Sequence, residues 1–220
     1  MRIVSINVGL PREVSWKERT VSTGIYKSPV EGPIKLNTLN LEGDGQADLS
    51  VHGGPDKTVY AYPGEHYEIW RKELSHPELN WGHFGENFTT QGLLEEDVYI
   101  GDTFRVGSAL IRVSQPRMPC YKLGIRFGRA DMVKRFLASR RSGFYLSVLE
   151  EGTVQAGDTI AYVKRSTHGI SVTDIFRLYA FDKEDWATMR RAVELEALPE
   201  SWRSHFKERL EQRDQGPTPD

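Results

Sequence analysis

The chain has 220 residues, of which 38% are hydrophobic and 10% aromatic, enough for the core of one large domain or of one domain and a small second one. A formal net charge of −2 excludes a broad basic surface for nucleic acid. No stretch approaches the ~20 apolar residues that cross a bilayer, and a single cysteine cannot form an internal disulfide. We therefore expect a soluble cytoplasmic protein that binds neither nucleic acid nor membranes.

Short β-branched or alternating segments, bounded by Gly, Pro or Asp, predict strands through the first three quarters of the chain. These segments are 3–8, 34–41, 98–104, 109–114, 144–149 and 159–163. Two helices interrupt them, one that begins near Pro63 and runs through residues 66–74 and one over residues 129–140. The composition is therefore mainly β with helices, and it favours a closed or nearly closed β-barrel, which leaves no exposed sheet edge.

The character of the sequence changes after Gly169, where three helices are predicted. They cover residues 171–181, 182–197 with Asp182 as N-cap, and 199–213. Ser171 and Asp174 have the spacing of a capping box, and the last helix has an apolar face made by Leu198, Trp202, Phe206 and Leu210. Isolated helices of this length are marginal in water, so we expect a bundle that packs on the barrel or on a partner, such as an electron donor or a second protomer.

These patterns divide the chain into a barrel domain over residues 1–167, a three-helix domain over residues 168–214 and a flexible tail over residues 215–220.

The lone cysteine stands in the stretch QPRMPCYKLG, residues 115–124, between two prolines that restrict the backbone. A lone cysteine is most often a small buried hydrophobic residue. Around Cys120, however, the segment 117–141 carries eight Lys and Arg residues and one acid, and such a field favours the reactive thiolate. We interpret Arg117, Lys122 and Arg126 as an anion site, and the later cations as a solvated helix face.

Two other loops contain candidate ligand residues. His52-Gly53-Gly54-Pro55 forms a turn in which glycine allows close backbone approach, and Lys57 follows it. In GENFTT, residues 85–90, Asn87 can donate to a ligand and the two threonines can bind an anion. Glycine-rich phosphate motifs are absent, so neither a flavin nor a nicotinamide site is expected.

Two other uses of the thiol were considered. The histidines have no zinc-ligand spacing, and we expect no zinc site. A Cys–His nucleophile, with His52 or His83 as the base, is compatible with the sequence because such partners need not be close along the chain. From the residues alone, the site is a thiolate in a cationic, Gly-lined pocket that binds an anion.

Four motifs together resemble the MOSC domain family, and within it the YiiM-type branch. They are DLSVHGGPDKTVYAYP, GENFTT, QPRMPC and SGFYLSVLEEGTVQAGDTI, in that order. The resemblance covers nearly the whole chain, because this branch also carries three helices after the barrel. It implies a β-barrel that binds the molybdenum cofactor, a pyranopterin dithiolene with a phosphate tail. It also implies that the cysteine, here Cys120, is a thiolate ligand of the metal and the catalytic residue.

The same resemblance implies which residues line the cofactor. They are His52, Gly53, Lys57, Asn87, Gln115 and Arg117, with Lys122 and Arg126 on the phosphate side. It further implies a reductase of N-hydroxylated bases such as 6-N-hydroxylaminopurine, which removes the N–OH oxygen with electrons from a separate reductase. The alternatives are a cofactor carrier or sulfur-handling module without turnover, and a cysteine hydrolase that is active without metal. A homodimer is compatible with the sequence.

Overall fold

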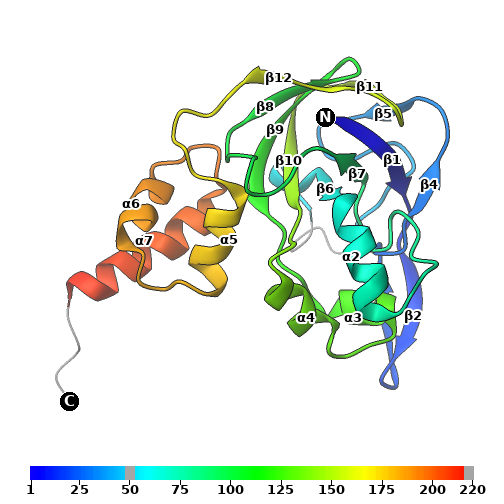
Figure 1. Cartoon of the computed structure of the whole chain (residues 1–220), viewed down its shortest axis with the longest axis horizontal. Coiled ribbons are helices and arrows are strands. Elements are labelled where there is room, and N and C mark those ends of the chain that lie inside the picture. Colours follow the sequence, from blue (N-terminus) through cyan, green and yellow to red (C-terminus); the bar gives the residue numbers. More distant parts are fainter. Residues whose placement is uncertain (48–52, 216–220) are drawn as a thin grey trace.

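The structure is a computed structural model that describes residues 1–47 and 53–215. Its centre is a mixed sheet of eight strands, shown in Figure 1. In order across the sheet these are β12 (Ile160–Lys164), β8 (Thr103–Val106), β9 (Ala109–Pro116), β10 (Phe144–Glu150), β6 (Val59–Pro63), β7 (Phe88–Gln91), β1 (Arg2–Val8) and β4 (Ser28–Val30). Only the pair β6–β7 is parallel among these neighbours.

Two smaller antiparallel pairs flank this sheet. One joins β5 (Ile34–Leu36) to β11 (Gly152–Val154), and the other is the hairpin of β2 (Arg12–Trp16) and β3 (Arg19–Thr23). The hairpin turns at Lys17 and Glu18, whose φ angles are 48° and 62°. Two positive φ angles in a two-residue turn match the right-handed twist of the strands. Sequence patterns missed this hairpin because neither residue is a glycine or asparagine.

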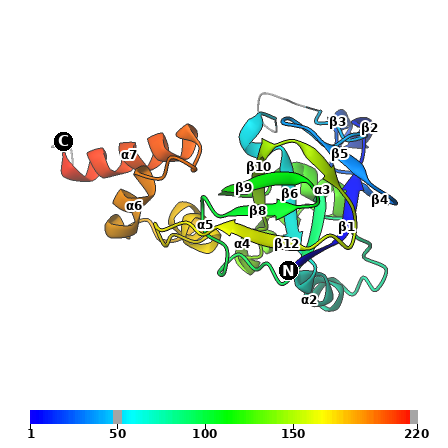
Figure 2. The same ribbon diagram turned by 90° about the horizontal axis from the view of Figure 1, so that it is seen from above.

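A closed barrel is not confirmed, because the ladders among the described strands leave β12 and β4 at opposite ends of the order. The sheet nevertheless curves strongly. An antiparallel bridge joins Arg2 to Thr159, and the amides of Ile3 and Ile160 donate to Asp158 O and Met1 O, both at 2.9 Å. Figure 2 shows β1 and β12 meeting near the N-terminus.

Two strand predictions were too long. The segment predicted over 34–41 ends at Leu36, and a turn then brings Leu41 back to bridge Leu36. The segment predicted over 98–104 becomes a strand only at Thr103. Its first residues bond instead to the start of the C-terminal part, since the amide of Ile100 donates to Ile170 O and that of Val172 to Val98 O. The alternation of apolar residues in this segment therefore indicated that the residues are buried, and it did not indicate that they belong to a strand.

Short helices cover one side of the sheet (Figure 1). They are the α-helices α2 (Glu65–Leu74), α3 (Tyr121–Phe127) and α4 (Met132–Ser139), whereas the 3₁₀ turn η1 (Pro55–Lys57) contacts β9 and β10. Pro63 ends β6 instead of starting α2, whose N-cap is Gly64. Beneath these helices lies a mainly aromatic cluster that includes Tyr62, Trp70, Phe84 and Phe136.

The three predicted C-terminal helices are present as α5 (Val172–Ala180), α6 (Trp186–Val193) and α7 (Glu200–Asp214). The Ser171–Asp174 capping box of α5 is confirmed. The N-cap of α6 is Asp185 and not Asp182, because the helix begins at Trp186 and Asp185 Oδ1 accepts from the amide of Thr188 at 3.1 Å. The predicted apolar face of α7 is buried through Trp202 and Phe206. Of the predicted flexible tail, residues 216–220 lie outside the described residues.

The helical part packs on the sheet and not away from it. One apolar cluster runs from Ile3 and Phe104 in the sheet to Ile175, Leu198 and Phe206 in the helices. Across residues 1–47 and 53–215, we find no helix with the length and apolar character needed to span a membrane.

Candidate functional site

Most of the predicted site residues meet at one pocket, which we call the thiol pocket. It is partly open to solvent, and its interior has a volume of about 100 Å³. Its walls come from segments 23–27 and 44–47, from β6 and from the loop between β9 and α3. Five predicted residues line it: Lys57, Asn87, Arg117, Cys120 and Lys122.

Two wall segments of the thiol pocket touch through their backbones. A Cβ atom on Gly24 would lie 2.5 Å from Gly45 O, which is closer than any real side chain approaches. Only glycine at position 24 therefore lets segments 23–27 and 44–47 meet.

Cys120 lies at the end of the proline-bounded loop, directly before α3. It is the N-cap residue of that helix in an extended conformation, and it is half-buried. It also lines a second pocket, so its thiol stands where the two pockets meet.

Arg117 is buried, with 6% of its surface exposed. Its guanidinium lies 5.2 Å from the ring centroid of Tyr60 and 5.0 Å from that of Phe136. Among the described residues, its Nη1 has no hydrogen-bond partner. A buried donor without an acceptor costs about 1–3 kcal/mol, more when it is charged, so this nitrogen indicates an anion in the thiol pocket.

The lining is cationic. Its described residues include four cationic side chains and one carboxylate, that of Asp44. The cations are Lys27, Lys57, Arg117 and Lys122. Lys27 and Asp44 are both buried and form an ion pair. Burial lowers the pKa of Lys57 from its ordinary value, while Asp56 acts in the opposite direction. The excess positive charge favours an anionic ligand.

Asn87 lines the thiol pocket, but its side chain is already bonded within the protein. Its Oδ1 accepts from the amide of Tyr60 at 3.1 Å, and its Nδ2 donates to Asp44 Oδ2 at 2.8 Å. Asn87 therefore positions the buried carboxylate of Asp44. Sequence reasoning missed Lys27 and Asp44, because residues 17 positions apart in two loops leave no periodic signal.

The two threonines of GENFTT do not form the anion site considered above. Thr89 is fully buried and donates to Glu86 Oε1 at 2.9 Å, while Thr90 is a fully buried residue of strand β7. Glu86 also accepts from the amides of Gly82 and Phe84, at 2.8 and 3.1 Å. Burial raises the pKa of Glu86, and these bonds act against that rise. The motif thus holds its own loop together.

Three predicted residues lie away from the thiol pocket. Gln115 lines the second pocket, where it donates to Asp56 O at 3.3 Å and accepts from Trp202 Nε1. Arg126 lies over the ring of Tyr26 at 4.8 Å, and Gly53 belongs to neither set of lining residues. His52 lies outside the described residues.

His83 does not support a Cys–His nucleophile, because it lines neither pocket that Cys120 lines. Its ring lies 4.6 Å from that of Phe127. Burial, with Arg126 and His76, lowers the pKa of His83 to about 3.

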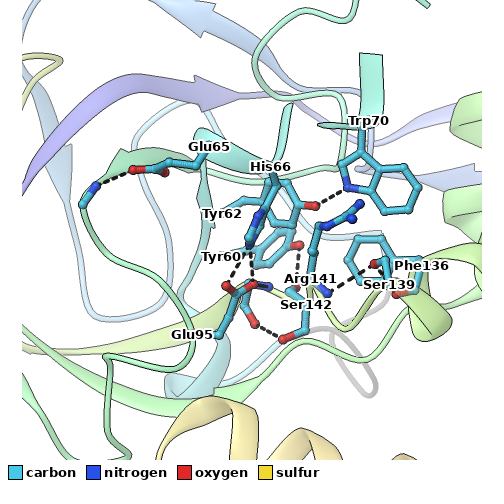
Figure 3. A network of polar contacts seen from close by, with 12 residues as sticks. Tyr60, Tyr62, Glu65, His66, Trp70, Glu95, Phe136, Ser139, Arg141 and Ser142 are labelled. Atoms are coloured by element: carbon cyan, nitrogen blue, oxygen red, sulfur yellow. Dashed lines mark hydrogen bonds and ion pairs between the residues drawn. The ribbon is translucent and has the colours of Figure 1, made fainter. Parts of the chain in front are cut away.

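A polar network fixes the back of the thiol pocket (Figure 3). The hydroxyl of Tyr60 donates to Ser142 O at 2.9 Å. Next to it, Glu95 accepts from the amide of Gly143 at 2.7 Å and bonds His66 Nε2 at 2.8 Å. These bonds tie β6 and α2 to the segment between α4 and β10, so the ring that stacks on Arg117 is rigidly placed.

Comparison with known proteins gives the family. Residues 48–161 match the MOSC domain and residues 170–213 match the YiiM-like, 3-alpha helix domain. Protein YflK of Bacillus subtilis (strain 168) is 44% identical over 211 residues, 94% of this chain and 95% of its own. A protein named Reductase from Gibberella moniliformis is 36% identical over 161 residues, 72% of this chain but 28% of its own.

The crystal structure of YiiM from Geobacillus stearothermophilus has the same fold. Its TM-score is 0.80 at 36% sequence identity, covering 95% of this chain and 98% of that one. The pocket motifs, the three C-terminal helices and these relatives agree: the chain belongs to the MOSC domain family, in the branch that carries the YiiM-like three-helix domain.

Proposed function

We propose that this protein binds the molybdenum cofactor in the thiol pocket and reduces N-hydroxylated compounds, with N-hydroxylated purines such as 6-N-hydroxylaminopurine as the substrate class. The observation that carries the proposal is the pairing, in one cationic pocket, of the Cys120 thiol with the buried unpartnered Nη1 of Arg117. Membership in the MOSC family supports it.

The residues of the thiol pocket fit such a group. A cysteine thiolate is the soft ligand that molybdenum prefers, and Lys57, Arg117 and Lys122 suit the anionic parts of the cofactor. In the described part of the chain, no three His, Cys, Asp or Glu side chains gather in a metal site. A metal at Cys120 would therefore take further ligands from an organic cofactor. When bound, the molybdenum cofactor supplies the two-electron redox chemistry.

The reaction balances as R–NHOH plus two electrons and two protons giving R–NH₂ and water. Lys57 lines both pockets that Cys120 lines, and its lowered pKa favours release of a proton from Nζ toward the departing oxygen. Arg117 holds the anionic ligand and excludes water from the aromatic wall behind it. A reducing, cytoplasmic compartment belongs to this proposal, because the thiol must stay reduced.

The electrons come from a separate donor reductase, since the sequence has no flavin or nicotinamide fingerprint. The name of the fungal relative, Reductase, is in keeping with a redox reaction.

Turnover with an artificial donor tests the function. Protein produced in cells that make the cofactor is mixed with a reduced viologen dye and 6-N-hydroxylaminopurine, and adenine is measured by chromatography. We expect adenine formation that stops when the protein is made without cofactor. A protein that contains molybdenum but forms no adenine would be a carrier, and formation of hypoxanthine and hydroxylamine without metal would indicate the cysteine hydrolase.

A further inference from the structure

A second pocket, which we call the helix pocket, lies where the C-terminal helices meet the loop that carries Cys120. Its interior has a volume of about 400 Å³ and is open to solvent. One wall comes from the end of β9 and the following loop, and the other from Tyr179 on α5 and Ser201, Trp202 and His205 on α7. Figure 1 shows α5 and α7 beside the strands of the sheet. The four MOSC motifs in the sequence contain none of these helix residues.

The helix wall is aromatic and partly fixed. Tyr179 and Trp202 have ring centroids 4.9 Å apart, and Tyr179 and His205 have theirs 5.0 Å apart. Trp202 is 8% exposed and its indole donates to the buried side chain of Gln115. Tyr179 is 40% exposed, so an exposed aromatic ring contacts the buried ring of Trp202. Such a wall offers flat apolar faces to a flat ligand.

The polar groups of the helix pocket suit a neutral heterocycle. Burial, with Arg209 as a smaller cause, lowers the pKa of His205, so its imidazole is neutral at pH 7 and presents one donor and one acceptor. Ser201 adds a hydroxyl. The described lining contains no Asp or Glu to attract a cation.

The two pockets are continuous at the thiol. Lys57, Met118, Cys120 and Tyr145 line both of them. A ligand in the helix pocket therefore reaches Cys120, whereas the buried guanidinium of Arg117 lines only the thiol pocket.

We propose that the helix pocket binds the base of the substrate, a neutral planar nitrogen heterocycle, and that Tyr179 and His205 are specificity-determining residues. The inference rests on the proposed function for the reaction, whereas binding of the base needs no cofactor. The base stacks on the exposed ring of Tyr179, which is tilted by 52° to the buried ring of Trp202, and its exocyclic N–OH group points toward Cys120. The three-helix domain thus supplies one half of the substrate site.

Binding of adenine to the full-length protein without cofactor is the first test, measured by isothermal titration calorimetry at pH 7. Tyr179→Ala and His205→Ala should each weaken binding at least tenfold. The matched controls are Tyr162→Ala, because Tyr162 is 39% exposed and lies on β12 outside both pockets, and His168→Ala, because His168 is exposed before α5. Absence of adenine binding, or equal losses in all four variants, would overturn the inference.

Kinetics on the cofactor-loaded protein separate this inference from the proposed function. The ratio of kcat/KM for 6-N-hydroxylaminopurine to kcat/KM for N-methylhydroxylamine should fall at least tenfold in Tyr179→Ala and His205→Ala, with molybdenum content unchanged. An unchanged ratio would contradict the role of the helix pocket in specificity. If neither compound is reduced but adenine binding follows the predicted order of variants, the proposed function fails while the base site stands.

Discussion

The guanidinium of Arg117 lies between two aromatic rings with one nitrogen that has no acceptor among the described residues. Arg141 is its natural comparison, because its guanidinium also lies over an aromatic ring, 5.2 Å from Trp70, yet it bonds Glu73 at 2.9 Å. Both arginines belong to the same positively charged segment of sequence. Of these two arginines, Arg117 has the buried donor without an acceptor among the described residues, so Arg117 and not Arg141 is expected to bind a ligand.

Arg117→Ala should weaken cofactor retention by roughly 1.5–3 kcal/mol, which is the usual value of a charge-assisted hydrogen bond. Arg141→Ala should leave retention unchanged. Cofactor remaining after dialysis, measured by fluorescence of the oxidised pterin, compares the two variants. Equal loss of cofactor from both variants would contradict the proposal that Arg117 binds the cofactor and Arg141 does not.

Titration of His83 makes the free energy of unfolding depend on pH. The pKa of His83 is about 3 in the folded protein and about 6.5 when unfolded, so the unfolded chain binds more protons between these values. Stability is therefore lost as pH falls from about 6.5 toward 3, and we expect a loss on the order of 1 kcal/mol at pH 4.5 after allowing for screening by water. Urea unfolding at pH 7 and pH 4.5 measures it. In His83→Asn the difference between the two pH values should shrink; an unchanged difference would assign it to other groups.

At this scale the sequence predicted residue types better than residue roles. Lys57, Arg117, Cys120 and Lys122 were placed in one pocket by motif and charge, and they line one pocket. Gln115 and Asn87 belong to the same motifs, but their amides are bonded to Trp202 and Asp44. Such partners come from distant elements, and a motif carries no information about them.

The secondary-structure elements were also predicted well only where the sequence pattern alone determines them. Strands with strong alternation, such as 109–114 and 144–149, were predicted close to their observed bounds in β9 and β10. The segment 98–104 was predicted too long because its apolar residues are buried by α5 and not by a neighbouring strand. The alternation of apolar residues predicts that one face of a segment is buried. Which element covers that face depends on tertiary packing.

Docking of α7 on β9 depends on one buried hydrogen bond, from the indole of Trp202 to Gln115. Trp202→Phe keeps an aromatic ring but leaves Gln115 Oε1 without this donor, which should cost about 1–3 kcal/mol of unfolding free energy. Trp186→Phe on α6 is the control, because Trp186 is half-buried and contacts Arg213 through its ring face. Chemical denaturation of both variants tests the bond. Equal destabilisation would mean that ring size, not the hydrogen bond, holds the helix.

On the scale of the whole molecule, the proposed substrate site lies at the junction between the sheet and the three helices. Cys120 lies at this junction, with the cationic thiol pocket on one side and the aromatic helix pocket on the other. The division at residue 167 stays a prediction, since one apolar cluster crosses it. The helices were expected on the barrel or on a partner, and the structure places them on the sheet.

A chain ending at Ser166 should still unfold cooperatively but at a lower temperature, because it loses the apolar contacts of α5 and α7 with β9 and the backbone bonds to Val98 and Ile100. It should keep molybdenum, since the residues of the thiol pocket all precede Ser166. Calorimetry and metal analysis follow the two properties. A truncated chain without a cooperative transition would make the helices part of a single domain.

Molybdenum content of the full-length protein and of Cys120→Ala tests the central claim most directly. Both are produced in cells that make the cofactor and are measured by elemental mass spectrometry, with circular dichroism to confirm folding. The substitution should cost on the order of 1 kcal/mol, within the stability margin of a domain, so the variant should fold. We predict stoichiometric molybdenum in the unmodified protein and background levels in Cys120→Ala. Equal molybdenum in both proteins, or none in the unmodified one, would contradict the thiolate site.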